Sequence, residues 1–270
     1  MEYFEAFILG LVQGVTEFLP ISSTAHLLIF TKVFGWQAVG EKTFVNAIQL
    51  GSVFAVFIYF WQDIRQIVGK GLGALQQKNW QREEWKILLG IAIGTIPALV
   101  GGFMLKVILK TDIESALVIA IASILLALVL GAAERWGSKT RTMAKLEVRD
   151  GILVGLGQML ALIPGVSRSG ATLSTGLFLG LERDAAAKFS FLLGIPTLTI
   201  ITVYESYKVF TELDTFGPLL VGIISAFIFS YLSIAWLLKF LRTQSTWIFV
   251  WYRLAFGSAI LGAIASGNFS

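Results

Sequence analysis

Long apolar segments separated by short polar stretches recur along the whole chain. Six of them approach the length of about 20 residues that a helix needs to cross a bilayer. Tryptophans such as Trp61, Trp136 and Trp247 lie near their ends, as side chains at a membrane interface do. The pattern predicts an all-α polytopic membrane protein with about six transmembrane helices, at residues 44–62, 87–107, 113–133, 189–207, 218–239 and 247–265.

Two further apolar segments, 7–34 and 154–181, are interrupted in the middle by proline and small polar residues. The first break is Pro20-Ile21-Ser22-Ser23-Thr24, and the second is Pro164-Gly165-Val166-Ser167-Arg168-Ser169-Gly170-Ala171-Thr172. Each segment is either one kinked span or a re-entrant helix–loop–helix, which enters and leaves the membrane by the same face.

The distribution of lysine and arginine favours the re-entrant interpretation. With both broken segments treated as re-entrant, 14 basic residues fall on one side of the membrane and 5 on the other, while Arg168 and Arg253 lie inside apolar segments. The positive-inside rule makes the first side cytoplasmic. Both termini are then outside, and the two broken segments enter from opposite faces.

This inversion predicts an internal repeat, with halves 1–135 and 150–270 joined by a basic cytoplasmic loop, 136–149, in a single membrane domain. The run Leu9-Gly10-Leu11-Val12-Gln13 resembles Val154-Gly155-Leu156-Gly157-Gln158, and a break follows each run. In inverted repeats, broken helices meet near the midplane and direct their N-termini at an anion. We therefore expect Ser23 and Arg168 to lie close together.

Composition supports a membrane protein and excludes several kinds of chemistry. The 270 residues are 56% hydrophobic and 14% charged, with a mean hydropathy of +0.78, whereas soluble domains contain about 25% charged residues. Cysteine is absent, which excludes disulfides, thiolate metal sites and a cysteine nucleophile. The net charge of +4 is small, and nothing indicates nucleic-acid binding.

The second break has the composition of a phosphate site. An arginine at membrane depth costs about 2.5–3.5 kcal/mol on insertion scales, so it is usually retained for a function. Arg168 can bind two phosphate oxygens through its guanidinium fork. Hydroxyl groups and two glycines, which let backbone N–H groups approach an anion, complete the candidate site: Gly165, Ser167, Ser169, Gly170 and Thr172.

The first break contains the acid of the candidate site. Gln13 and Glu17 are four residues apart and share one helix face. Glu17 has three interpretations: a ligand of a hard metal with Gln13 as oxygen neighbour, a general base, or the partner of Arg168 in a structural ion pair.

The remaining polar residues of this break have both structural and functional interpretations. Ser22, Ser23 and Thr24 can cap the following helix, and a capped helix N-terminus facing a cavity also binds anions. His26, the single histidine, is either structural or a base beside a hydroxyl nucleophile. Arg253, one turn into the last span, is expected to extend to the membrane surface.

At these two motifs the chain resembles the undecaprenyl pyrophosphate phosphatase family, membrane enzymes also known as bacitracin-resistance proteins. One pattern is [E/Q]xxxE continuing into FLPxSSTxH, here residues 13–26, and the other is PGxSRSxxT, here residues 164–172. The resemblance extends over the full chain.

The resemblance implies hydrolysis of a C55 polyprenyl pyrophosphate to the monophosphate and inorganic phosphate, which recycles the carrier lipid of peptidoglycan and other envelope polymers. It also implies bacitracin resistance, a divalent cation (Mg²⁺ or Ca²⁺), a homodimer, and a site in the bacterial inner membrane that opens to the outside. Glu17 becomes a metal ligand or base, Ser23 the candidate nucleophile and His26 its proton partner. Arg168 then holds the pyrophosphate, supported by the hydroxyl groups of both motifs.

Two positions depart from the family pattern. Gln13 replaces a frequent glutamate, and an amide can coordinate a metal but cannot act as a base, so Glu17 is left as the principal acid. Ala25 replaces a frequent glycine, and we expect only a packing effect. Attack by Ser23, and attack by an activated water while Ser23 binds phosphate, both remain open.

Three other functions compete with a phosphatase of this family. Inverted repeats with broken helices are also the architecture of secondary transporters, so a carrier of a lipid phosphate or another anion is the main alternative. Phosphatidic-acid phosphatases of the second type need two histidines, and this chain has one. A purely structural membrane protein does not explain Arg168 among hydroxyl groups.

Overall fold

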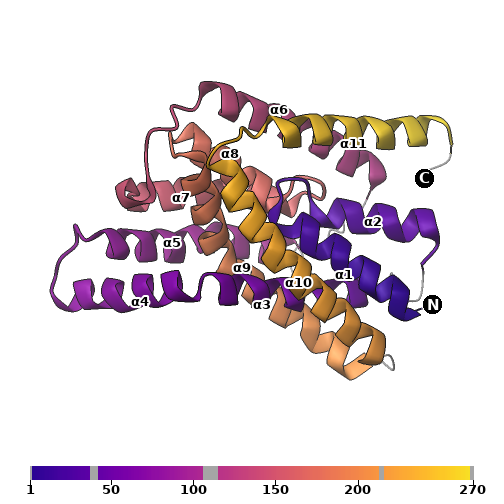
Figure 1. Ribbon diagram of the computed structural model, residues 1–270, viewed down its shortest axis with the longest axis horizontal. Coiled ribbons are helices and arrows are strands. Elements are labelled where there is room, and N and C mark those ends of the chain that lie inside the picture. Colours follow the sequence, from indigo (N-terminus) through magenta and orange to yellow (C-terminus); the bar gives the residue numbers. More distant parts are fainter. Residues whose placement is uncertain (1, 37–41, 106–114, 213–215, 268–270) are drawn as a thin grey trace.

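The computed structural model describes residues 2–36, 42–105, 115–212 and 216–267, and in these ranges the fold is all α (Figure 1). The α-helices are α1 (Glu2–Phe18), α2 (Ser23–Phe34), α3 (Lys42–Tyr59), α4 (Trp61–Gln76), α5 (Glu83–Phe103), α6 (Ala116–Trp136), α7 (Val148–Met159), α8 (Arg168–Phe178), α9 (Arg183–Glu212), α10 (Phe216–Leu241) and α11 (Trp247–Ala265).

The predicted transmembrane helices are present. α5, α6, α9, α10 and α11 are each long and apolar enough to cross a membrane, and α3 with α4 forms a sixth candidate span, bent by 64°. α11 has the predicted bounds, 247–265. The predicted end of the second span at Val107 and the predicted start of the third at Ile113 lie outside the described residues.

Helix α4 was not predicted, because the first span was expected to end at residue 62. Instead the chain bends at Phe60 and continues as an amphipathic helix. Ile67 and Gly71 are buried on its inner face, and Gly71 approaches Leu88 of α5. Packing against a neighbouring helix stabilises this segment, which is too polar to stand out in a hydropathy pattern.

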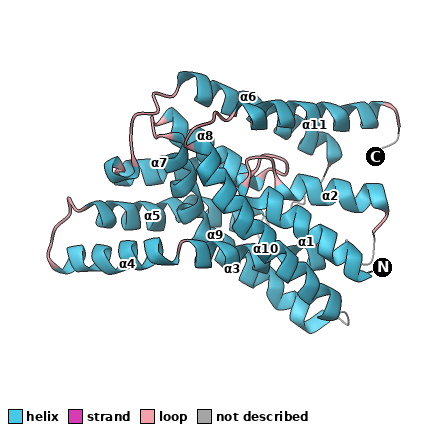
Figure 2. Ribbon diagram, viewed as in Figure 1, coloured by secondary structure: helices cyan, strands magenta, loops and turns pink. Residues whose placement is uncertain are grey.

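Both broken segments are re-entrant, as predicted. α1 and α2 have 17 and 12 residues, and α7 and α8 have 12 and 11, so each is shorter than the ~20 residues of a span. Figure 1 shows α1 and α2 extending toward the side where both termini lie, whereas α7 and α8 extend toward the opposite side. Figure 2 shows their connecting loops meeting at the centre of the molecule.

The two halves contain equivalent contacts at a constant offset. Gln13 donates to Ser52, and Gln158 donates to Thr197, over the same separation of 39 residues. Each second-half position is the first-half number plus 145: 13 and 158, 52 and 197, 22 and 167. Helix packing shows the same correspondence between the halves. α1 packs on α10, and its counterpart α7 packs on α5. α3 packs on its counterpart α9, and α6 packs on its counterpart α11. These contacts support the predicted inverted repeat.

The connection between α6 and α7 holds the second hairpin at its base. Arg141 donates to both carboxylate oxygens of Asp150, at 3.0 and 2.6 Å, and to the carbonyl of Leu179 at 2.9 Å. The hydrogen bond with Asp150 raises the pKa of Arg141, so its guanidinium stays charged. The start of α7 is thereby fixed to the end of α8, and the loop between these helices is held at the molecular centre.

Candidate active site

The two central loops end in the same unusual helix cap. Ser22 and Ser167 have positive φ angles, 75° and 68°, and each accepts a hydrogen bond from a backbone N–H three residues on. A non-glycine residue at positive φ is strained, and such strain is concentrated at functional sites. The N-terminal residues of α2 and α8 line the same central cavity.

Direct contacts join the two loops. Ser169 Oγ donates to the carbonyl of Leu19 at 2.9 Å, and Arg168 Nη2 donates to Glu17 Oε1 at 3.3 Å. The residues joined by these two contacts are 150 and 151 positions apart along the chain. The prediction that the second motif reaches the first is confirmed.

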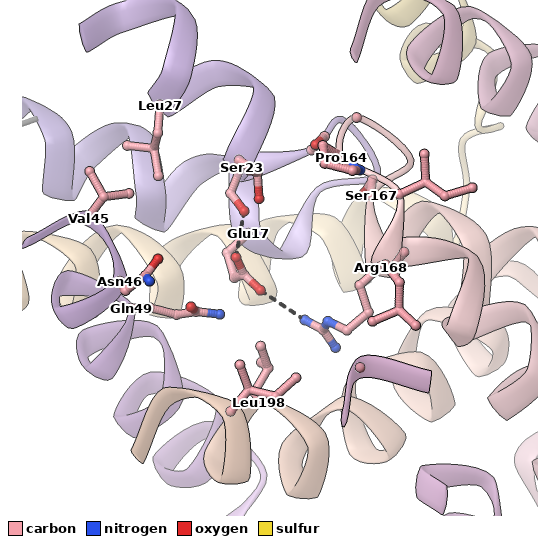
Figure 3. Close-up of a pocket in the computed structure, with 18 of the residues that line it drawn as sticks. Glu17, Ser23, Leu27, Val45, Asn46, Gln49, Pro164, Ser167, Arg168 and Leu198 are labelled. Carbon is pink, nitrogen blue, oxygen red and sulfur yellow. Dashed lines mark hydrogen bonds and ion pairs between the residues drawn. The ribbon is translucent and has the colours of Figure 1, made fainter. Parts of the chain in front are cut away.

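Glu17 is the centre of this arrangement (Figure 3). Its Oε2 accepts from Ser23 Oγ at 2.7 Å and from Gln13 Nε2 at 3.1 Å, while Oε1 accepts from Arg168. The residue is buried, with an exposed fraction of 8%. Ser23 and Arg168 are thus brought together by one carboxylate, as expected, and the predicted ion pair of Glu17 with Arg168 is present.

Arg168 retains unused hydrogen-bonding capacity. Its Nη2 contacts Glu17, but Nε and Nη1 are buried and have no hydrogen-bond partner among the described residues. A guanidinium carries five N–H donors and is costly to bury unsatisfied. Gly194 of α9 packs so closely that an added Cβ would lie 1.6 Å from Nη1. The guanidinium is therefore held in place by α9. Its Nε and Nη1 have no acceptors among the described residues, which fits an anion site.

A cavity of about 440 Å³ surrounds these groups, within the range of about 300–1,000 Å³ common for small-molecule sites. Figure 3 shows Glu17, Ser23, Asn46, Gln49 and Arg168 around it. Its other walls are apolar and come from several helices, including Leu27, Val45, Leu162, Leu198 and Ile201. The cavity thus combines a polar, charged region with an apolar one.

Eight of the predicted site residues line this cavity: Gln13, Glu17, Ser22, Ser23, Thr24, Gly165, Ser167 and Arg168. Gly165 has a φ of 93°, and a Cβ there would lie 2.6 Å from the carbonyl oxygen of Ile119, so glycine is required for the turn.

Three residues expected to bind substrate have other partners and do not line the cavity. Ser169 bonds to the Leu19 carbonyl, as described, and the Gly170 N–H donates to Ser167 Oγ at 3.2 Å. Thr172 Oγ1 bonds to the Arg168 carbonyl at 2.8 Å and to Ser190 Oγ. They hold the loop and α8 in place, because packing of α8 against α6, α7 and α9 turns them away from the cavity.

His26 does not contact Ser23. Its Nδ1 bonds to the carbonyl of Ser22 at 2.7 Å, and its Nε2 bonds to Tyr252 Oη at 2.6 Å. The ring stacks on Phe256, with centroids 4.3 Å apart. Both nitrogens are therefore occupied on the side of α2 that faces α11, and the predicted contact with Ser23 does not form. Glu17, not His26, is the base within hydrogen-bonding distance of Ser23.

The prediction that Arg253 extends to the membrane surface is wrong. Arg253 is fully buried, with 0% exposed. Nη1 donates to the Pro20 carbonyl at 3.1 Å, Nη2 to the Gly165 carbonyl at 2.8 Å, and Nε to the Ser123 carbonyl at 3.2 Å. It therefore links both central loops to α6. Its position near a helix end gave no sign of this role, because the carbonyls that it binds belong to distant segments.

Six polar cavity residues were not predicted as site residues: Thr31, Asn46, Gln49, Gln158, Thr197 and Glu205. All but Glu205 are amide or hydroxyl side chains within apolar segments, which is an available signal. Gln158 was noted only for the repeat, and the hydropathy pattern alone does not show which face of a span turns inward.

The donor set suits a hard cation only in part. Among the described residues, no group of three or more His, Cys, Asp or Glu side chains could hold a metal. Glu17, Ser23, Asn46 and Gln49 offer oxygen atoms to the same cavity, and Glu205 also lines it. Mg²⁺ is commonly bound by one or two carboxylates together with substrate phosphates. The residues therefore fit a cation shared with a phosphate ligand.

Comparisons with known proteins identify the family of this chain. The family described as "Bacitracin resistance protein BacA" matches residues 6–259. A protein of Thermosynechococcus vestitus named undecaprenyl-diphosphatase is 56% identical over 98% of this chain and 97% of its own length. One of Trichormus variabilis with the same name is 50% identical over 99% of this chain and 85% of its own length. Since the match includes both central loops and nearly all the spans, this chain belongs to the bacitracin resistance protein BacA family.

Proposed function

We propose that this protein hydrolyses undecaprenyl diphosphate to undecaprenyl phosphate and inorganic phosphate. One observation carries the proposal: the buried Arg168 has two nitrogen atoms without acceptors and shares Glu17 with Ser23 at a cavity. The names of the relatives support the same substrate. The apolar walls of the cavity suit the start of a prenyl chain, whose remainder stays in lipid.

The residues divide the reaction between binding and proton transfer. Phosphoryl transfer depends mainly on positioning and on positive charge at the phosphate oxygens. Arg168 supplies this charge through its fork, and low-dielectric walls strengthen each contact. In the proposed step, Ser23 Oγ attacks the terminal phosphorus, the bond to the bridging oxygen breaks, and undecaprenyl phosphate leaves. Glu17 takes the Ser23 proton across their 2.7 Å hydrogen bond.

Water then hydrolyses the phosphoserine and releases inorganic phosphate. The alternative is direct attack by a water that Glu17 activates, with Ser23 binding phosphate. Residual turnover by Ser23→Ala, without a trapped phosphoenzyme, favours the water route. Complete loss in that variant, together with trapped phosphoserine in the wild type, favours the serine route.

A divalent cation, Mg²⁺ or Ca²⁺, is part of the proposal. Glu17 would hold it, with Gln13 as a neighbour whose amide would have to rotate, because its Nε2 now faces Glu17. When bound, the cation supplies positive charge to the phosphate oxygens.

We assign the protein to the bacterial inner membrane as a multi-pass protein, with the cavity open to the outside. The wider role is then recycling of the lipid carrier for peptidoglycan and other envelope polymers, with bacitracin resistance as a consequence.

The chain lacks cysteine, so single introduced cysteines report the membrane topology without background labelling. In cells, Gln77→Cys is expected to resist a membrane-impermeant maleimide, and Ser266→Cys to react. The reverse pattern contradicts the orientation. A homodimer is checked by light scattering in detergent.

The decisive experiment measures phosphate release from undecaprenyl diphosphate by detergent-purified protein, with and without EDTA, beside Arg168→Ala. Release that disappears with chelation and with the mutation supports a metal-dependent phosphatase. No release from folded, lipid-supplied protein refutes the proposal. It then favours the carrier alternative, which is tested by headgroup translocation in vesicles.

A further inference from the structure

We propose that Gln158 is a substrate ligand that binds the diphosphate beside Arg168. This inference rests on the proposed function. Gln158 is 2% exposed and belongs to the cavity lining. Its Nε2 donates to Thr197 Oγ1 at 3.0 Å, while its Oε1 is buried and has no partner in the part of the chain that the structure describes. A buried amide atom without a partner needs an explanation, and a ligand bound in the adjoining cavity supplies one.

The ligand that this amide can bind depends on its rotamer, because Oε1 accepts hydrogen bonds and Nε2 donates them. Rotation of the amide by 180° exchanges its oxygen and nitrogen. In that rotamer the Thr197 hydroxyl donates to Oε1, and both Nε2 hydrogens are left for another acceptor. A phosphate oxygen supplies this acceptor. Every polar atom of the pair then has a partner, whereas the resting arrangement leaves Oε1 without one.

The inverted repeat supports an anion at this position. In the first half, the equivalent Gln13 donates to Ser52 and also to the carboxylate of Glu17, four residues on. In the second half, the residue four positions after Gln158 is the apolar Leu162. Gln158 therefore has the hydroxyl partner of its counterpart but lacks the anionic one. The diphosphate takes the place that Glu17 occupies in the first half.

Helix α9 brings Gln158 close to Arg168. The partner of Gln158 is Thr197, and the residue that packs against Arg168 Nη1 is Gly194. Positions three apart on a helix lie on one face, about 5–6 Å from each other. The amide of Gln158 and the guanidinium of Arg168 thus contact neighbouring positions on one face of α9, and both residues line the same cavity.

Three variants of the full-length protein separate binding from structural support. Gln158→Leu removes the amide. Gln158→Glu keeps an acceptor for the Thr197 hydroxyl but puts a carboxylate against the phosphate. Thr197→Val removes the hydroxyl and keeps the amide. The matched controls are Gln66→Leu and Gln66→Glu on the exposed side of α4. Each protein is assayed for KM and kcat on undecaprenyl diphosphate, and for the rise in melting temperature that inorganic pyrophosphate causes.

A ligand role predicts a specific order of effects. Hydrogen bonds to charged groups correspond to about 10- to 100-fold in affinity. Gln158→Leu should raise KM by about this factor, Gln158→Glu should raise it further, and Thr197→Val should have the smallest effect. Inorganic pyrophosphate should stabilise the wild type and both controls, but not Gln158→Glu. Because Gln158→Leu leaves a buried hydroxyl unpaired, the folded Gln158→Glu variant decides the result.

The opposite order overturns the inference. If Thr197→Val impairs the enzyme as much as Gln158→Leu, and Gln158→Glu binds inorganic pyrophosphate normally, then Gln158 only supports the packing of α7 on α9. Failure of the proposed function is recognised separately, because the wild type then releases no phosphate. The melting-temperature experiment still decides in that case whether Gln158 contacts the anion.

Discussion

The substitution Gly194→Ala is expected to make the protein more stable and less active. Gly194 is in the interior of α9, where alanine is favoured over glycine by about 0.5–1 kcal/mol. Its nearest neighbour is the far end of the Arg168 side chain, so the fold can accept a methyl group if that side chain moves.

The size of this movement follows from the structure. The added Cβ would lie 1.6 Å from Nη1, and ordinary contact begins at 3.4 Å. The guanidinium must therefore move by about 1.8 Å, the difference between the two distances, since a packed interior does not tolerate overlap. A displacement of about 1 Å at a reacting centre can reduce the rate by about 100-fold. We expect kcat/KM on undecaprenyl diphosphate to fall by about this factor or more.

The assay compares Gly194→Ala with Gly262→Ala, since a Cβ at Gly262 of α11 has no atom within 4 Å. Phosphate release is measured across substrate concentrations, and the melting temperature is measured on the same samples. The control should gain stability and keep its activity, whereas Gly194→Ala should gain stability and lose activity.

Two results would refute the reasoning. Wild-type turnover in Gly194→Ala would mean that the position of Arg168 set by α9 is unimportant for the reaction. A lower melting temperature together with lower activity would mean that loss of the Glu17 ion pair or a movement of α9 outweighs the helix propensity of alanine, and the activity loss could not be assigned to the position of Arg168 alone.

Three other substitutions test the roles assigned above. Arg253→Met should lower both the melting temperature and phosphate release, since each buried carbonyl left without a donor costs about 1–3 kcal/mol; unchanged activity would show that linking the loops is unnecessary. His26→Phe should lose only part of the turnover, whereas Glu17→Gln should lose nearly all of it; equal losses in phosphate release would return His26 to the role of base. Arg168→Lys should raise KM at least about tenfold, because a point charge cannot replace the bidentate fork; an unchanged KM would exclude bidentate binding.

The sequence was sufficient to predict the membrane class and the number of spans. Both depend only on the local composition of each segment, because about 20 consecutive apolar residues identify a span whatever its neighbours are. The two breaks were equally clear, since proline and hydroxyl residues interrupt otherwise apolar segments. The distribution of basic residues and the sequence similarity between the halves predicted the re-entrant hairpins and the inverted repeat. These are properties of short segments or of their order along the chain.

The contacts around Glu17 were predicted only as alternatives. The motifs marked Glu17, Ser23 and Arg168, but their residue types allowed a metal ligand, a base or an ion pair. The distances in the structure bring Ser23 Oγ and Arg168 Nη2 to opposite oxygens of Glu17. Such contacts depend on how α1 and α8 approach each other, and no local pattern encodes this.

Only the tertiary structure decided the direction in which polar side chains point. His26 and Arg253 were misjudged for the same reason: each bonds to a segment more than 80 residues away, Tyr252 for the first and the Gly165 carbonyl for the second. Gln158 was recognised as part of a repeat but not as part of the cavity. A sequence determines which segments enter the membrane because lipid acts on each segment separately. The partners of a buried polar group depend on the packing of several helices together, and here this packing turned Gln158 and Arg168 toward one cavity and His26 away from it.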